Sequence, residues 1–184
     1  TEIYTVVTIV VKFLLGLASA LLLNRRFWAR NFFRVFFLIP WILPSLVTCF
    51  TWRWLLDDLV GVVSYLLTQV GLQSVAWLSR PGAAMGAVIG VNIWRGFPFF
   101  GILLLAALQA IPDELYDAAR VDGAGHVQSF FHITLPGVRK IALVAVLLST
   151  IWTFNDFELL WVMTGPTPSP GQAAGQSRLP RRGD

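Results

Sequence analysis

The sequence predicts an all-α integral membrane protein with about four transmembrane helices. Charged residues make up 13% of the 184 residues, whereas soluble domains carry about 25%, and 56% of the residues are hydrophobic. The hydrophobic residues lie in four continuous stretches, each of roughly the 20 residues that a spanning helix needs. These stretches do not alternate apolar and polar residues, which excludes a transmembrane β-barrel. Cys49 is the single cysteine, so internal disulfides and cysteine-rich metal sites are also excluded.

The first predicted span covers residues 3–23 and is interrupted only by Lys12. We expect Lys12 to face a neighbouring helix, because a charge at membrane depth needs a partner. The second predicted span covers residues 35–56 and contains Pro40 and Pro44. Membrane helices tolerate proline, so both prolines predict kinks within one span and not helix ends.

The third and fourth predicted spans cover residues 83–108 and 141–163. Pro98 lies inside the third span, where we again expect a kink. Between the second and third spans, apolar residues at helical spacing predict a short interfacial helix within residues 60–72. Residues 1–164 are thus expected to form one membrane domain.

The basic residues of the chain predict its orientation. The connections before the second and fourth spans lie on one side of a bundle of antiparallel spans. They contain Arg25, Arg26, Arg30, Arg34, Arg120, Arg139 and Lys140. The positive-inside rule therefore places loops 24–34 and 109–140 in the cytoplasm. In so apolar a chain, the net charge of +4 indicates this membrane face and not a nucleic-acid partner.

The last segment, residues 165–184, does not fit this pattern. It is rich in Gly, Pro, Ser and Gln, a composition that cannot bury a core and predicts a disordered tail. It follows the fourth span on the external side, yet it carries Arg178, Arg181 and Arg182.

The connection at residues 112–137 is much longer than the roughly 2–8 residues that usually link helices. Pro112 and the two acidic residues after it are typical of the first turn of a helix. Gly123 is a natural helix stop, because glycine accepts the left-handed conformation that often ends helices. A second short helix is expected to follow and to end at Leu135 and Pro136. The segment therefore predicts a helix–turn–helix on the cytoplasmic surface.

This segment resembles the EAA loop of binding-protein-dependent ABC importer permeases. The motif reads Asp117-Ala118-Ala119, three residues, Gly123, nine residues, and Ile133-Thr134-Leu135-Pro136. Other segments resemble the carbohydrate branch of that family, namely residues 22–25, 33–34, 39–41, 93–99, 105–112 and 152–157.

The resemblance implies a multi-pass inner-membrane subunit that moves sugars, oligosaccharides or related polyols and performs no chemistry itself. Its loop would be the coupling helix that docks on cytoplasmic ATP-binding subunits, which hold the ATP and Mg. No cofactor would bind this chain directly. The other implied partners are a second permease subunit, an extracytoplasmic solute-binding protein and the lipid bilayer. The implied docking residues are Asp117, Ala118, Ala119, Asp122, Gly123, Ile133, Leu135 and Pro136.

The sequence departs from the family pattern in three places. Asp117 stands where the family has glutamate, one methylene longer. The family has a further span before residue 3, and it continues beyond Gly165 with more glycines and another span. We therefore expect a chain that is incomplete at both ends, or one whose end has been altered, for example by a frameshift.

Ionisable residues at membrane depth identify candidates for a solute path: Asn155, Asp156 and Arg95. At 1.5 Å per residue, Arg95 and Asp156 lie about 18 and 22 Å into their spans from opposite sides, so their depths differ by about 10 Å. Direct pairing is therefore not indicated. The alternative is that Arg95 satisfies backbone groups freed by Pro98.

Other kinds of site are not indicated by the sequence. The spacing of His126 and His132 is not a metal signature, and no catalytic constellation is present. Gly123-Ala124-Gly125 lacks the lysine and the preceding strand of a phosphate-binding loop. The alternatives left open are a permease for amino acids, polyamines or ions, and a channel or membrane scaffold without an ATPase.

Overall fold

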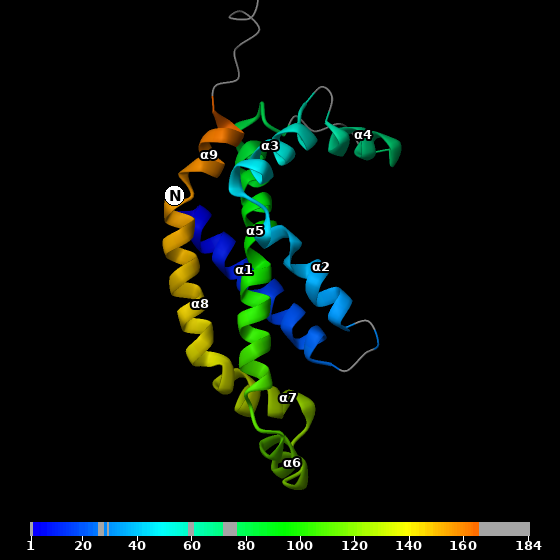
Figure 1. Cartoon of the computed structure of the whole chain (residues 1–184), viewed down its shortest axis with the longest axis vertical. Coiled ribbons are helices and arrows are strands. Elements are labelled where there is room, and N and C mark those ends of the chain that lie inside the picture. Colours follow the sequence, from blue (N-terminus) through cyan, green and yellow to red (C-terminus); the bar gives the residue numbers. More distant parts are fainter. Residues whose placement is uncertain (1, 26–27, 29, 59–60, 72–76, 166–184) are drawn as a thin grey trace, which may run out of the picture.

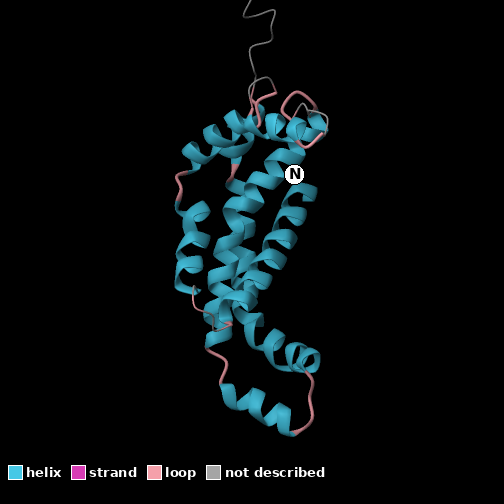
Figure 2. Cartoon of the chain, turned by 90° about the vertical axis from the view of Figure 1, so that its right-hand side faces the viewer, coloured by secondary structure: helices cyan, strands magenta, loops and turns pink. Residues whose placement is uncertain are grey.

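The computed structural model describes residues 2–25, 28, 30–58, 61–71 and 77–165, and within these ranges it contains helices and turns but no strand (Figures 1 and 2). The all-α prediction is confirmed for this part of the chain. The helices are α1 (Glu2–Asn24), α2 (Arg30–Ile42), α3 (Ser45–Leu55), α4 (Val62–Gln69), α5 (Pro81–Gln109), α6 (Asp113–Val121), α7 (His126–Ser129), the π-helix η1 (Phe130–Thr134), α8 (Leu135–Asn155) and α9 (Phe157–Thr164).

The long helices run along the length of the molecule and the short ones lie at its two ends (Figure 1). Helices α6 and α7 lie at one end, here called the α6 end. Helices α3, α4 and α9 lie at the other, the α9 end. Among the described residues, α1, α5 and the helix His126–Asn155 are long and apolar enough to cross a membrane. Helices α2 and α3 provide a further crossing if they count as one broken span.

The contact between α1 and α5 is the most extensive helix pairing of the described chain. A Cβ atom on Gly16 would lie 2.4 Å from Cβ of Phe100, so only glycine permits the observed approach of the two backbones. Phe100 is fully buried there and packs edge-to-face on Phe13. Small residues commonly set close helix crossings in membranes, where apolar burial alone provides little driving force.

The second predicted span is broken, so the expectation of a mere kink at Pro44 was wrong. Helix α2 ends at Ile42, and α3 begins at Ser45 in a direction that differs by 91°. Pro44 is the N-cap of α3. Proline has no N–H to continue the preceding helix, and its ring disfavours helical geometry in the residue before it. Pro40 and Pro98 lie inside α2 and α5, whose helices continue past them.

The fourth predicted span also differs, because α8 ends at Asn155 and α9 begins at Phe157. Asp156 joins them with φ −81° and ψ 47°, outside the helical region. The reason is tertiary: the Asp156 carboxylate is bound by side chains of α5, as described below.

The second short helix of the predicted helix–turn–helix does not end at Leu135 and Pro136, and this expectation was also wrong. Helix α7 runs through η1 into α8 and forms one helix from His126 to Asn155. Pro136 occupies the first turn of α8, a position that proline tolerates. The π-helical residues of η1 directly precede α8.

Two apolar cores divide α5 into halves. The core toward the α6 end is built from α1, α5 and α8 and includes Phe100 and Leu104. The core toward the α9 end is built from α3, α5 and α9 and includes Val88 and Leu159. Residues 92–96 of α5 lie between the two cores, where polar side chains gather.

The predicted tail, residues 165–184, lies outside the described residues except for Gly165.

Candidate functional site

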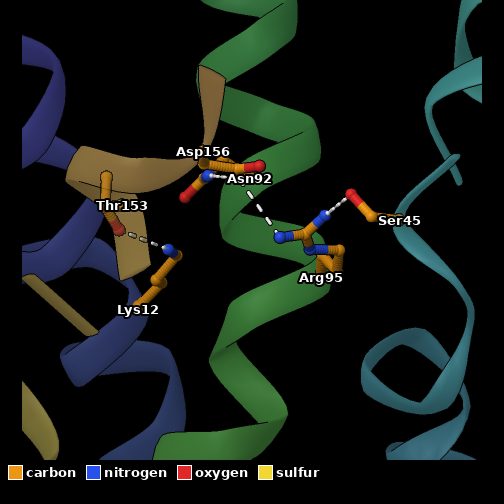
Figure 3. A network of polar contacts seen from close by, with 6 residues as sticks. All are labelled: Lys12, Ser45, Asn92, Arg95, Thr153 and Asp156. Carbon is orange, nitrogen blue, oxygen red and sulfur yellow. Dashed lines mark hydrogen bonds and ion pairs between the residues drawn. The ribbon is translucent and has the colours of Figure 1, made fainter. Parts of the chain in front are cut away.

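Polar side chains from several helices meet between the two apolar cores. This polar cluster consists of Lys12 of α1, Ser45 of α3, Asn92 and Arg95 of α5, and Thr153 and Asp156 at the end of α8 (Figure 3). Its hydrogen bonds join residues as far as 141 positions apart in the chain. The cluster is therefore a product of the tertiary fold.

Asp156 accepts two hydrogen bonds from α5. Asn92 Nδ2 donates to Asp156 Oδ2 at 2.8 Å, and Arg95 Nη2 donates to the same oxygen at 3.2 Å. The side chain of Asp156 is 7% exposed and that of Arg95 is 25% exposed. Hydrogen bonds between charged groups are stronger than neutral ones, particularly away from water. They hold the break between α8 and α9 against α5.

Arg95 also reaches the second helix break. Its Nη1 donates to Ser45 Oγ at 2.6 Å, and Ser45 is the first residue of α3, directly after Pro44. The guanidinium thus links α5 to both breaks. Its hydrogen bonds go to these side chains, and not to backbone groups near Pro98 as the alternative interpretation held.

Lys12 enters the cluster from α1 and faces a neighbouring helix, as the sequence predicted. Its Nζ donates to Thr153 Oγ1 at 3.3 Å, and the residue is only 5% exposed. The side chain passes directly over Gly96, where a Cβ atom would lie 2.5 Å from Lys12 Cε. A larger residue at position 96 would therefore displace the ammonium group.

The cluster borders a small cavity of about 60 Å³. Its lining combines the charged side chains with aromatic rings: Lys12, Trp41, Asn92, Arg95, Gly96, Phe99, Ser149, Trp152, Thr153 and Asp156. Oδ1 of Asn92 is buried and has no hydrogen-bond partner among the described residues. The cavity thus places charged donors beside aromatic surfaces.

The structure brings two of the three predicted solute-path residues together. Arg95 and Asp156 form an ion pair, although the difference in depth argued against pairing. That calculation counted only the rise along two straight helices, whereas the arginine side chain is long and α8 ends at Asp156. Asn155 is exposed, and its Nδ2 donates to Ile151 O of the same helix, so it does not join the cluster.

Sequence reasoning missed the uncharged members of the cluster. Ser45, Asn92 and Thr153 carried no charge to mark them, and Lys12 was expected to find a partner but not this one. Asn92, an amide in the middle of an apolar helix, is the signal that could have been used.

The segment expected to be the coupling loop, residues 112–137 and called the coupling loop below, projects from the α6 end (Figure 2). Pro112 is the N-cap of α6, one position before the expected first turn. Gly123 has φ +79° and ends the helix, as predicted, and the N–H of Ala124 donates to Ala119 O at 2.8 Å. Glycine is favoured here because a left-handed conformation strains residues that carry a Cβ atom.

The predicted docking residues are divided between two elements. Asp117, Ala118 and Ala119 lie on α6 and are followed by Asp122 and Gly123, whereas Ile133 lies in η1, and Leu135 and Pro136 begin α8. Ala119 and Ile133 are half-buried, and the remaining six are exposed. Asp117 Oδ1 accepts a hydrogen bond from Arg120 Nη1 at 3.0 Å on the open surface of α6.

Two contacts attach α6 to the long helix. The hydroxyl groups of Tyr116 and Thr134 are 2.9 Å apart and share a hydrogen bond, and Thr134 is buried. Ile111, just before α6, packs against Gly137 of α8, where a Cβ atom would lie 2.7 Å from Ile111 Cδ1. From Thr134 the long helix runs about 33 Å, at 1.5 Å per residue, to the Asp156 break. The coupling loop and the polar cluster lie at opposite ends of one continuous helix.

No group of three or more potential metal ligands occurs in the described part of the chain.

The sequence matches the family described as "Binding-protein-dependent transport system inner membrane component" over residues 12–178. The match includes α1 from Lys12 onward, the polar cluster and the whole coupling loop.

Relatives with assigned transport systems show the same family. The chain is 37% identical over 168 residues to the trehalose/maltose transport system permease protein MalF of Thermococcus litoralis, covering 91% of this chain and 57% of that protein. It is 36% identical over 168 residues to the sulfoquinovosyl glycerol transport system permease protein SmoG of Agrobacterium fabrum, covering 91% and 54%. The chain thus spans a little more than half the length of these relatives.

Two solved structures share the fold. One is a bacterial ABC transporter that imports the acidic polysaccharide alginate, with TM-score 0.75 and 25% identity over 89% of this chain and 60% of that chain. The other is a bacterial alginate transporter bound to its pentasaccharide-loaded periplasmic protein, with TM-score 0.79 and 25% identity over 90% and 58%.

These similarities confirm the resemblance to carbohydrate-branch permeases that the EAA-like motif indicated. The apolar helices and the family match identify a multi-pass protein of the inner membrane. The chain belongs to the family of binding-protein-dependent transport system inner membrane components.

Proposed function

We propose that this chain is the membrane-spanning part of a permease subunit in an ATP-driven importer of sugars, oligosaccharides or related polyols. One observation carries the proposal: an exposed coupling helix is bonded to a long helix that ends at a buried polar cluster. Such a path can transmit movement from a docking surface to a solute site.

In this proposal α6 docks on a cytoplasmic ATP-binding subunit that holds ATP and Mg, and ATP hydrolysis takes place there. Loops 24–34 and 109–140 face the cytoplasm, in agreement with their basic residues. The negative charge of Asp117 lies exposed on α6 and is available to a basic partner surface. A second permease subunit and an extracytoplasmic solute-binding protein complete the importer.

The polar cluster is proposed to line the solute path, with Arg95 and Asp156 as solute contacts. The lining of the cavity supplies charged donors and two tryptophans, the hydrogen-bonding groups and aromatic surfaces to which hydroxyl-rich rings bind. Relatives named for trehalose/maltose and sulfoquinovosyl glycerol transport support a carbohydrate solute over amino acids, polyamines or ions. They also support an importer over a channel or scaffold without an ATPase.

The docking assignment is tested by Asp117→Lys and Gly123→Asp in the full-length permease, coexpressed with its ATP-binding subunits. Both variants are expected to lose copurification of the ATPase or its stimulation by solute. Asp117→Glu, which restores the longer family side chain, is expected to retain both. Gly71→Asp is the matched control for Gly123, because Gly71 also has positive φ (+82°) and open surroundings, but lies beyond α4.

If both docking variants bind and stimulate the ATPase normally, α6 is not the docking element. The solute class is tested separately, by uptake of a panel of labelled sugars, amino acids and polyamines into proteoliposomes. Uptake of amino acids or polyamines without any sugar would contradict the carbohydrate assignment.

A further inference from the structure

The charged side chains that line the cavity of the polar cluster do not balance. The lining contains two cations, Lys12 and Arg95, and one anion, Asp156. Asp156 is paired with Arg95. No carboxylate among the described residues forms an ion pair with Lys12. Glu158, two residues beyond Asp156, is not part of the lining. The cavity therefore carries one positive charge in excess.

Burial of the Lys12 ammonium at this position destabilises the protein unless an anion offsets its charge. It is 5% exposed, and its one hydrogen bond goes to the neutral hydroxyl of Thr153 at 3.3 Å. An ammonium group has three N–H donors, so two remain available. Burying a cation without an anion costs far more than a hydroxyl acceptor returns.

The surroundings hold the Lys12 ammonium at the cavity. Gly96 leaves room for the lysine side chain, because any Cβ atom there would lie 2.5 Å from Lys12 Cε. Figure 3 shows Lys12 on the α1 side of the cluster and Arg95 toward Ser45, so the unpaired cation and the paired one are separate.

We propose that the transported solute carries an anionic group, a carboxylate, sulfonate or phosphate on a sugar, and that Lys12 binds it during passage. This inference rests on the proposed function and specifies its solute class. The anion supplies the negative charge that the cavity lacks. A neutral sugar leaves the Lys12 charge uncompensated.

The test uses the full-length permease in its assembled transporter, reconstituted in proteoliposomes with its solute-binding protein. The probes are a labelled disaccharide that contains glucuronate and the neutral disaccharide of the same linkage with glucose in its place. We expect the wild type to import the acid in preference. Lys12→Met keeps the aliphatic length and is expected to lower uptake of the acid about tenfold, the effect of one lost charge-assisted hydrogen bond.

Two further variants test whether the positive charge must lie at position 12 or whether loss of any lysine charge lowers uptake of the acid. Lys12→Arg retains the cation and is expected to retain most of the uptake. Lys140→Met removes the other lysine of the chain, which is exposed near the start of α8, and is expected to leave uptake of the acid unchanged.

Thermal unfolding in detergent separates recognition from a structural role. If Lys12 binds the solute, Lys12→Met unfolds at the same or a higher temperature, because a buried unpaired charge has been removed. A lower unfolding temperature with unchanged preference for the acid would overturn the proposal and leave Lys12 a structural residue.

The outcomes also distinguish this inference from the proposed function. Import of neutral sugars alone, by a transporter whose ATPase responds to Asp117→Lys as expected, overturns the anionic solute and preserves the importer. Equal import of both disaccharides that Lys12→Met does not change also overturns the anionic solute and preserves the importer. If no sugar of the wider panel is imported, the proposed function and this inference both fail.

Discussion

Two Asp–Arg ion pairs of similar length lie in opposite environments in this molecule. Asp117 and Arg120 are 3.0 Å apart on α6, with side chains 67% and 74% exposed. Asp156 and Arg95 are 3.2 Å apart, with side chains 7% and 25% exposed. The first pair is three residues apart on one helix, whereas the second joins α5 to the end of α8.

This difference in environment separates two kinds of functional residue. Exposed pairs contribute about 0–1 kcal/mol, because water and salt screen them, so Asp117 is free to exchange Arg120 for a partner surface. A buried pair is costly to break, because either charge alone is left without solvation. The coupling loop is therefore suited to transient binding, and the polar cluster to holding two helix breaks in place.

The largest expected effect comes from removing the buried acid. Asp156→Ala leaves the half-buried Arg95 and the buried Lys12 side by side without an anion, and should lower the free energy of unfolding by about 3–5 kcal/mol. Thermal unfolding in detergent measures it. Asp117→Ala, the matched change on the exposed pair, should cost less than about 0.5 kcal/mol.

A double variant makes this prediction sharper. Arg95→Met combined with Asp156→Leu removes both charges and should recover most of the lost stability, because no charge of the pair remains buried alone. If Asp156→Ala and Asp117→Ala are equally mild, the two pairs do not differ as their burial indicates.

A smaller effect is expected at the other helix break. Ser45→Ala removes the acceptor for Arg95 Nη1 and should cost about 1.5–3 kcal/mol, the usual range for a hydrogen bond to a charged group. Amide hydrogen exchange around the start of α3 should increase. Ser79→Ala is no suitable comparison, since Ser79 binds Asp58. Ser19→Ala serves as the control, because Ser19 is a half-buried serine of α1 whose hydroxyl bonds to Leu15 O within the same helix. Unchanged exchange at α3 would show that Arg95 does not hold this break.

The contact between the coupling loop and the long helix predicts a still smaller effect on stability but a specific effect on coupling. Tyr116→Phe removes the hydroxyl bonded to Thr134 and should cost about 0.5–1.5 kcal/mol. Copurification with the ATPase should persist, while stimulation of ATP hydrolysis by solute falls.

A double-mutant cycle with Thr134→Val tests whether the two hydroxyl groups act together. The combined variant should be no worse than either single variant, because each removes the same bond. Fully additive losses would mean that Tyr116 and Thr134 act independently.

The smallest effect is expected at Arg120. Arg120→Gln breaks the exposed pair on α6 and should change the free energy of unfolding by at most about 0.5 kcal/mol, because both partners are solvated and lie on the same helix. Thermal unfolding at low and high salt measures it. A large loss would show that the exposed pair stabilises α6 as strongly as the buried pair stabilises the cluster.

Much of the coupling loop was predictable because its signals are local. Gly123 ends α6 through its own backbone conformation, and the acidic residues after Pro112 stabilise the helix start, so neighbouring residues suffice. The end expected at Pro136 was wrong, since whether a proline stops a helix or begins one depends on the turn before it. Here η1 leads directly into α8.

The sequence by itself determined the membrane class, the apolar helices, the family and the charged candidates Arg95 and Asp156. Only the tertiary structure decided that the second and fourth spans are broken, and that Asp156 binds Arg95 and Asn92 while Lys12 turns to Thr153. Composition and periodicity record what each segment can bury, which is a local property. Which polar groups satisfy one another depends on how helices up to 141 residues apart are packed. Inside an apolar bundle, that pairing decides where a helix can break.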